Sequence, residues 1–434
     1  MDSPGSASDA SKEGGLRDAG AEAGVFDGGV VDAGFNPFVG RWSLIPGAPP
    51  SCDALVADDP ASSVGPLKWE RCASGRSGCR QLVVNWTTEP GHVIDVHRTD
   101  VVRLVQSTPY IVYRRLYIKN LIEPLAYIDV VQPLDQNPLF ATGAFTVAPN
   151  PCGPTTSIGE RGIAIEAHPP GAPAVEVLTW SSWSQPVTLT TALVDLTQFG
   201  LNAGGYIQHS VIGTDAIYLE TKYPDSIDVF SLVDRRVIVP RVPMRIPAEQ
   251  PRTVAEGALV QDFLDPYSID LLKSDGSYDK LVAPSAPHAI TSLAVDRSSP
   301  SSLVWVESDG DGPFTNEVIW VSPYASTAAG IARRKVALLA DTNGRGGGSM
   351  VANRGVVLNV VADQKAVLTR LSDGMGWDIH ADSGSGFVDA LWVDDDEVWL
   401  STASLARRNF RAYTSGIVRI ARSSLGLPTV SPGF

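Results

Sequence analysis

One short pattern recurs along the chain, an apolar and β-branched strand that ends in polar residues. Its clearest copy is Ile217-Tyr218-Leu219-Glu220-Thr221. Four further copies share this character: Val304-Trp305-Val306-Glu307-Ser308, Val398-Trp399-Leu400-Ser401-Thr402, Ile163-Ala164-Ile165-Glu166-Ala167 and Val357-Leu358-Asn359-Val360. Self-similarity at a period of roughly 50 residues is typical of radial repetition, because each unit buries its faces only against its neighbours. The repeat therefore predicts a β-propeller, although length alone suggests two or three domains.

Aligning the repeats gives seven units. The second strands centre on Val112, Ile163, Ile217, Leu259, Val304, Val357 and Trp399. Third strands follow at Ile128–Val130, Val175–Val177, Ile227–Val229, Ile269–Leu271, Val318–Trp320, Val367–Leu368 and Ile417–Val418. Inner strands are expected at Tyr206–Val211, Ile290–Val295, Met350–Asn353 and Phe387–Val393. The predicted fold class is an all-β, seven-bladed propeller, with eight blades as the alternative if residues 69–98 form a blade of their own.

Tight turns predict the outer strands. Asp275-Gly276 precedes Tyr278–Val282, and Asp373-Gly374 precedes Trp377–His380. Asp-Gly between apolar runs favours a hairpin, because glycine adopts a positive φ without strain. A third outer strand is expected at Val237–Val239. Polar residues alternate within the third strands, which predicts that these strands are less deeply buried than the second; the residues are Asp129, Glu176, Asp228 and Asp270.

The charge of the chain excludes one class of partner. The formal net charge is -14, whereas nucleic-acid binding needs a basic surface that displaces counterions. The same charge disfavours adhesion to anionic lipid. No apolar run reaches the ~20 residues that span a bilayer. We therefore expect no nucleic-acid partner, and membrane association only through a lipid anchor that this chain lacks.

All four cysteines lie in the first part of the chain, at Cys52, Cys72, Cys79 and Cys152. No pair has CxxC spacing and no histidine stands at zinc-ligand spacing from them, so no metal site is predicted. Two disulfides formed in an oxidising compartment are expected instead. Three pairings are open from the sequence; Cys52–Cys72 with Cys79–Cys152 is our working choice.

Residues 1–35 are a low-complexity segment rich in Asp, Ala and Gly, as in Asp18-Ala19-Gly20 and Asp32-Ala33-Gly34. Such a segment has almost nothing to bury, so it is predicted to be a disordered spacer. It resembles the spacers that follow the lipidated cysteine in exported propeller lipoproteins of the myxobacterial type. The resemblance implies that Met1 replaces a removed signal sequence and that the native protein is exported and tethered. The expected location is the outer membrane, with a free periplasmic or extracellular form as the alternative.

The domain organisation follows from these features. Residues 36–98 form a cysteine-containing lead-in, and residues 99–434 form the propeller blades. Two strands of the lead-in are expected near Leu82–Trp86 and Val93–Val96. One of them is predicted to pair with the last blade, because propellers close in order to avoid an open sheet edge.

Catalytic motifs are scarce. HExxH, GxSxG, Walker A and kinase motifs are absent from the sequence. Gly344–Gly348 lies between two predicted strands, with no helix to form a phosphate site. Ser277-Tyr278-Asp279-Lys280 matches SxxK in a hairpin turn and is read as chance. Asp309–Gly312 and Asp394–Glu397 offer oxygen ligands but are interpreted as solvated turns. No cofactor is predicted.

The best binding candidate is the loop of the last blade, where arginines alternate with aromatic residues. Guanidinium groups pair with carboxylates and aromatic side chains anchor interfaces, so the loop suits an acidic partner. The candidate binding residues are Arg407, Arg408, Phe410, Arg411 and Tyr413, together with Tyr223, which is expected on the same face.

A second candidate site lies in the predicted central channel, where His209 and Asp389 fall on inner strands. Three functions remain open. The first is an exported, non-enzymatic module for protein or ligand recognition or scaffolding, and the second is a subunit of a larger cell-envelope complex. The third is a propeller hydrolase or lyase acting on glycans or lactones, which requires convergent acid–base groups in the channel. We expect recognition of a protein partner or cell-envelope component rather than catalysis.

Overall fold

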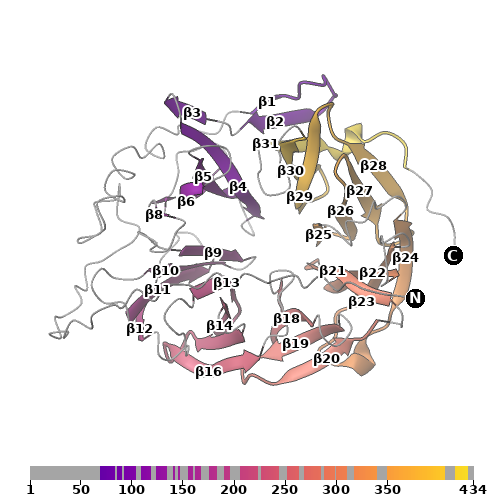
Figure 1. The fold of residues 1–434 in the computed structure, drawn as a ribbon. Helices are drawn as coiled ribbons and strands as arrows, with labels where there is room; N and C mark the ends of the chain where they lie inside the picture. Colours follow the sequence, from indigo (N-terminus) through magenta and orange to yellow (C-terminus); the bar gives the residue numbers. More distant parts are fainter. Residues whose placement is uncertain are drawn as a thin grey trace, which may run out of the picture. The chain divides into compact units, whose positions relative to one another are not determined.

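A computed structural model describes residues 69–83, the strands between 86 and 212, and most of 213–428 (Figure 1). The gaps in that last part are 223–225, 244–251, 263–267, 285–287, 299, 310–316, 340–348 and 406–415. Side chains are described mainly in 69–82 and beyond residue 213. The predicted spacer and Cys52 and Cys152 lie outside the described residues, and the predicted domain boundaries stay predictions.

Five sheets are four-stranded antiparallel meanders of consecutive strands. In chain order they are β9 (Thr155–Gly159), β10 (Gly162–Ala167), β11 (Val175–Ser182), β12 (Thr190–Asp195); β13 (Tyr206–Ile212), β14 (Ala216–Lys222), β15 (Ser226–Ser231), β16 (Arg236–Pro243); β17 (Arg252–Thr253), β18 (Gly257–Asp262), β19 (Ser268–Lys273), β20 (Tyr278–Val282); β21 (His288–Asp296), β22 (Ser302–Asp309), β23 (Glu317–Pro323), β24 (Arg334–Leu339); and β25 (Met350–Asn353), β26 (Val356–Ala362), β27 (Lys365–Arg370), β28 (Gly376–His380).

Two further sheets complete the described strands. One contains β3 (Trp86–Glu89), β4 (His92–Arg103), β5 (Pro109–Ile118), β6 (Pro124–Pro133), β7 (Phe140–Ala141) and β8 (Phe145–Thr146). The other joins β29 (Ser385–Val393), β30 (Glu397–Ser404) and β31 (Gly416–Ala421) to β2 (Cys79–Val83) and β1 (Glu70–Arg71). Two 3₁₀ turns, Ala328–Gly330 and Arg422–Ser424, are described beside the strands.

The first strands of successive sheets lie side by side, as β9 with β13, β13 with β17, β21 with β25, and β25 with β29. Apolar clusters fill the space between successive sheets. Val304 and Val306 of β22, for example, pack with Val357 of β26, and Leu358 of β26 packs with Leu400 of β30. This is the organisation of a β-propeller, so the predicted all-β propeller class is confirmed, and the number of blades stays a prediction. Every predicted second and third strand falls within a described strand.

Third strands are less buried than second strands in two sheets, as predicted: β23 and β31 contain half-buried residues, whereas Leu303–Ser308 of β22 and Val398–Ser401 of β30 are buried. The polar positions of β15 and β19 are nevertheless covered. Asp228 of β15 and Asp270 of β19 are 0% and 8% exposed. The Ser268 hydroxyl donates to Oδ1 of Asp270 at 3.0 Å. Both faces of these sheets pack against neighbouring sheets, so even the polar positions of a third strand are covered. At Asp270 the buried carboxylate is accommodated by this hydrogen bond rather than by solvent.

The last sheet is completed by the start of the described chain. β2 pairs with β31 from Cys79↔Ile420 to Val83↔Gly416, which is the pairing expected for the strand near Leu82. The other expected strand, Val93–Val96, belongs instead to β4 and pairs with β5.

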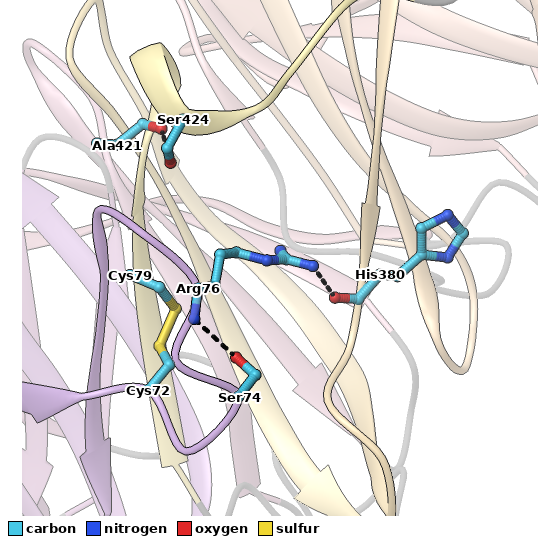
Figure 2. The surroundings of a disulfide bond; sticks show 7 residues. All are labelled: Cys72, Ser74, Arg76, Cys79, His380, Ala421 and Ser424. Carbon is cyan, nitrogen blue, oxygen red and sulfur yellow. Dashed lines mark hydrogen bonds between the residues drawn. A yellow bond between two sulfur atoms is a disulfide. The ribbon is translucent and has the colours of Figure 1, made fainter.

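The working disulfide assignment is wrong. Cys72 bonds to Cys79, so the bridge closes a short hairpin within the lead-in (Figure 2). Both cysteines are buried in the cluster that contains Leu358 and Leu400. Sequence spacing does not determine connectivity, and here the β1–β2 hairpin places the two residues opposite one another. The bridge indicates an oxidising environment.

The hairpin also reproduces a contact between the outer strands of other sheets. Nη2 of Arg76 donates to the carbonyl of His380 at the end of β28, at 2.9 Å (Figure 2). In an earlier sheet, Nη1 of Arg333 donates to the carbonyl of Ala283 after β20, at 3.1 Å. Close approach at this rim also explains Gly374, whose φ is +75° and where a Cβ would lie 2.2 Å from the carbonyl oxygen of Val336.

Two arginines each lie against a pair of tryptophan rings in a matching way. Arg333 lies 4.6 Å from the Trp320 ring and 5.8 Å from the Trp305 ring, and forms an ion pair with Glu307. Arg419 lies 4.4 Å from the Trp399 ring and 4.9 Å from Trp69, with Glu397 as its ion-pair partner. Trp69 precedes β1 and contacts Trp399 edge to face, so the lead-in supplies one ring of the second pair.

Replacing Cys72 and Cys79 together by serine should lower the free energy of unfolding by about 2 kcal/mol, because the bridge restricts a short loop in the unfolded chain. Urea denaturation measures the change. Peptide mapping of the oxidised protein should recover the Cys72–Cys79 link. An unchanged denaturation midpoint, or a link from Cys72 to another cysteine, would contradict this assignment.

Arg333→Ala should destabilise the protein more than Arg419→Ala. Glu307 is 3% exposed and Glu397 is 28% exposed, so removing Arg333 leaves the more deeply buried carboxylate without a counter-ion. We expect a loss of about 3 kcal/mol for Arg333→Ala and about 1 kcal/mol for Arg419→Ala. Chemical denaturation of the two variants compares their losses directly. Equal losses in free energy of unfolding would contradict the claim that the burial of the carboxylate determines the cost.

Candidate functional site

The two predicted sites are described to different extents. The loop residues Arg407, Arg408, Phe410, Arg411 and Tyr413, and also Tyr223, lie outside the described residues. His209 lies on β13 and Asp389 on β29, so both predicted channel residues belong to the first strand of their sheets. The binding and channel assignments stay predictions.

A register shift occurs at a similar position in the first strands β13, β21 and β29, and also in β4, which follows β3 in its sheet. The register shifts between Val96 and Arg98 in β4, between Ile207 and His209 in β13, between Ile290 and Ser292 in β21, and between Phe387 and Ala390 in β29. The extra residue interrupts the alternation and re-aims the neighbouring side chains. His209 directly follows one bulge and Asp389 lies in another, so the two predicted channel residues share a structural position.

Polar side chains hold the bulge of β29 from two sides. The N–H of Asp389 donates to Oγ of Ser401 at 2.8 Å, and the N–H of Ala390 donates to Oγ of Ser349 at 3.1 Å. Ser401 belongs to the partner strand β30, whereas Ser349 precedes β25 in the neighbouring sheet. The backbone that carries Asp389 is therefore fixed before any ligand binds.

The bulge of β21 is held in a comparable way. Nε2 of Gln261, at the end of β18, donates to the carbonyl of Ile290. Ile290 is the last paired residue before this bulge. In both sheets a side chain from the preceding sheet bonds the backbone of the irregular segment, which indicates that the bulges are a built part of the inner strands.

The bulges lie toward the end of the sheets that carries the predicted binding loop. Opposite the bulges lie Glu220 of β14, Val306 of β22 and the segment between Leu400 and Thr402 of β30, at or beyond the middle of each second strand. The segment 405–415 follows β30 directly. Its first residue is anchored, since the N–H of Leu405 donates to the carbonyl of Gly384 at 3.0 Å.

The acid-rich turn at Asp394–Glu397 is held by its own hydrogen bonds. Oδ1 of Asp394 accepts from the N–H groups of Asp396 and Glu397 at 2.9 and 2.8 Å, while Asp395 forms an ion pair with Arg354 of the neighbouring sheet. These contacts agree with a structural turn. Across the residues whose side chains are described, no group of three or more His, Cys, Asp or Glu could hold a metal ion.

The serine of the SxxK segment, Ser277, forms hydrogen bonds within its own hairpin turn. The hydroxyl of Ser277 donates to Oδ1 of Asp275 at 2.6 Å, and its N–H donates to the same oxygen at 2.9 Å. These bonds, with the hydroxyl contact first, hold the pKa of the Asp275 carboxyl below its usual value. Ser277 thus stabilises the turn, and reading this motif as chance agrees with the geometry.

Sequence reasoning missed the bulges and the side chains that hold them. Ser349 and Ala390 are far apart in sequence, and so are Gln261 and Ile290. The bulged strands keep an ordinary apolar pattern, so nothing in their composition marks the extra residue. The available signal is polarity within an inner strand, at His209, Thr291 and Asp389.

Comparison with known proteins gives similarity to solved structures at low sequence identity. No protein-family model matches the sequence, and no curated protein is similar to it at the sequence level. Virginiamycin B lyase from Staphylococcus aureus is 11% identical, with 79% of this chain and 99% of that chain covered, at a TM-score of 0.44.

Two other solved structures give comparable matches. The Swd1 β-propeller domain of Myceliophteria thermophila is 10% identical, with 75% of this chain and 98% of that chain covered, at a TM-score of 0.44. A chain of a nidogen–laminin complex is 14% identical, with 65% of this chain and 89% of that chain covered, at a TM-score of 0.32. At these low TM-scores the similarities carry no argument about fold or function.

Proposed function

We propose that the protein is an exported recognition propeller that binds an acidic protein partner or cell-envelope component through the loop between β30 and β31. The observation that carries the proposal is the anchoring of this loop beside the fixed bulge of β29. β30 pairs with β31 from Glu397↔Ala421 to Thr402↔Gly416, so both ends of the loop start from a buried sheet.

The charge of the loop supports an acidic partner. Arg407, Arg408 and Arg411 lie close together in a chain whose net charge is -14. The rest of the surface therefore repels polyanions, and attraction must come from a local group of cations. Phe410 and Tyr413 would supply the apolar anchors that make such a contact specific.

Export and tethering complete the proposal. The Cys72–Cys79 bridge supports an oxidising compartment, and the Asp-Ala-Gly-rich segment of residues 1–35 would serve as a spacer between a lipid anchor and the propeller. Among the described residues, no helix has the length and apolar character to cross a bilayer. Membership of a larger envelope complex is compatible with the same loop serving as the contact.

The triple variant Arg407→Ala/Arg408→Ala/Arg411→Ala should lose binding to an acidic peptide. Poly-glutamate of defined length on a biosensor surface is the probe. We expect at least a tenfold weaker affinity and a smaller salt dependence, because three charge pairs are lost. The matched control replaces the exposed Arg71, Arg80 and Arg235, which changes the net charge equally at other sites.

Equal loss in the two triple variants would mean that net charge alone controls binding. Unchanged binding in the loop variant, or no binding of the probe to the unmodified protein, would reject the loop as the site. Thermal unfolding of each variant checks that the fold is retained.

One observation favours an enzyme as the second candidate: His209 directly follows the bulge of one inner strand and Asp389 lies in the bulge of another, and bulges are enriched next to active sites. If the protein is a lyase or hydrolase, His209→Ala should abolish turnover of glycan or lactone substrates while leaving thermal stability nearly unchanged. Ser349→Ala, which disturbs only the support of the β29 bulge, should lower turnover less. A full loss of stability in His209→Ala would instead show a structural histidine.

A further inference from the structure

The turn between β25 and β26 holds an arginine in a backbone conformation that suits glycine. Asn353 pairs with Val356, so the turn itself consists of Arg354 and Gly355. Their φ values are 49° and 74°. Two-residue turns with positive φ at both positions favour Asn or Gly at the first one, because a larger residue meets its own backbone there. Arg354 is therefore strained, and such strain persists only where the surroundings impose it.

A buried carboxylate of the preceding sheet imposes this conformation. Asp296, the last residue of β21, is 2% exposed. Its Oδ1 accepts the N–H of Arg354 at 2.9 Å, and its Oδ2 accepts the N–H of Gly355 at 2.6 Å. Ser298 fixes the carboxylate within its own turn, since its N–H donates to Oδ1 at 2.9 Å and its hydroxyl at 2.6 Å. Successive N–H groups of a turn can converge on one anion, so this carboxylate stabilises the positive φ values.

The side chains of the same segment reach the following sheet. Nδ2 of Asn353 donates to the carbonyl of Val393 at 2.9 Å, and Arg354 forms an ion pair with Asp395. Val393 ends β29, and Asp395 lies in the turn before β30. The side chains of Arg354 and Asp395 are both 57% exposed, so their ion pair contributes little stability by itself. The contact depends on a turn that already directs Arg354 toward the following sheet.

We infer that Asp296 operates a conformational interlock between three successive sheets. Its carboxylate holds Arg354 in the strained conformation, and that conformation brings Asn353 and Arg354 onto the β29–β30 turn. Asp296 thereby fixes the Asp394–Glu397 turn through contacts that other residues make. The interlock lies at turns between first and second strands, whereas the candidate binding loop joins a second strand to a third. The two lie at opposite ends of the sheets, so the inference does not rest on the proposed function.

Hydrogen–deuterium exchange of the full chain tests the transmission. Asp296→Ala should speed exchange about tenfold at Arg354–Gly355 and also at Asp394–Glu397, because local opening of the first turn releases the second. Asp275→Ala is the matched control, since this carboxylate accepts hydrogen bonds from Ser277 within its own turn, and it should leave both segments unchanged. Unchanged exchange at Asp394–Glu397 in Asp296→Ala, or equal acceleration in the control, overturns the inference.

Arg354→Gly tests whether Asp296 acts by holding a strained residue. Glycine adopts the turn without strain and keeps the N–H group. Asp296→Ala should lower the thermal midpoint by several degrees in the unmodified chain, and by no more than about half as much in the Arg354→Gly background. Where Asp296→Ala does not fold, Asp296→Asn retains one acceptor oxygen and gives the same comparison.

Arg235→Gly provides the matched control background. Arg235 also has a positive φ, of 55°, but its N–H donates to the carbonyl of Ser231 in its own sheet at 3.0 Å. The full loss caused by Asp296→Ala should therefore remain in that background. Equal losses in all three backgrounds reject the interlock.

Discussion

Residues 79–83 hydrogen-bond to residues 416–420, so a strand from the start of the described chain completes a sheet built from its end. Without β2, the edge of β31 would expose a row of unpaired N–H and C=O groups. The lead-in also supplies Trp69, whose ring contacts Arg419, and Arg76, which donates to the carbonyl of His380. The β1–β2 hairpin therefore completes the last sheet through β31 and also contacts the preceding sheet through Arg76.

The Cys72–Cys79 bridge acts on this hairpin. Its two residues are buried with Leu358 and Leu400, and the carbonyl of Gly78 accepts the N–H of Ala421 at 2.9 Å. The bridge thus holds the loop in the form that contacts both sheets. A disulfide at this point keeps the hairpin folded, and detachment of the hairpin would expose the edge of β31. Rigidity at this point also supports the strands from which the candidate binding loop begins.

Local patterns in the sequence were sufficient for much of the fold. Apolar second strands such as Val304–Val306 and the Asp275-Gly276 and Asp373-Gly374 turns predict the strands and hairpins that the structure contains. Disulfide pairing and coverage by other sheets have no comparable local pattern in the sequence. Cysteine spacing did not reveal the Cys72–Cys79 pair, and the polarity of Asp228 and Asp270 suggested exposure because the covering sheets lie elsewhere in the chain.

The candidate site was predictable only in part. The sequence placed His209 and Asp389 on inner strands, and the structure puts both at bulges. The support of these bulges by Ser349 and Gln261 comes from neighbouring sheets, and no local pattern encodes it. The chemistry of the arginine loop remains a prediction from composition, because its recognition depends on a partner surface.

Hydrogen–deuterium exchange on two shortened chains tests the closing contact most directly. One chain begins at residue 69 and retains β1 and β2; the other begins at residue 84, and both lack Cys52. Loss of the hairpin should remove protection from peptides covering Gly416–Ala421 and Gly376–His380, while the β17–β20 sheet keeps more of its protection. Equal protection of Gly416–Ala421 in the two chains would contradict the claim that β2 closes the propeller.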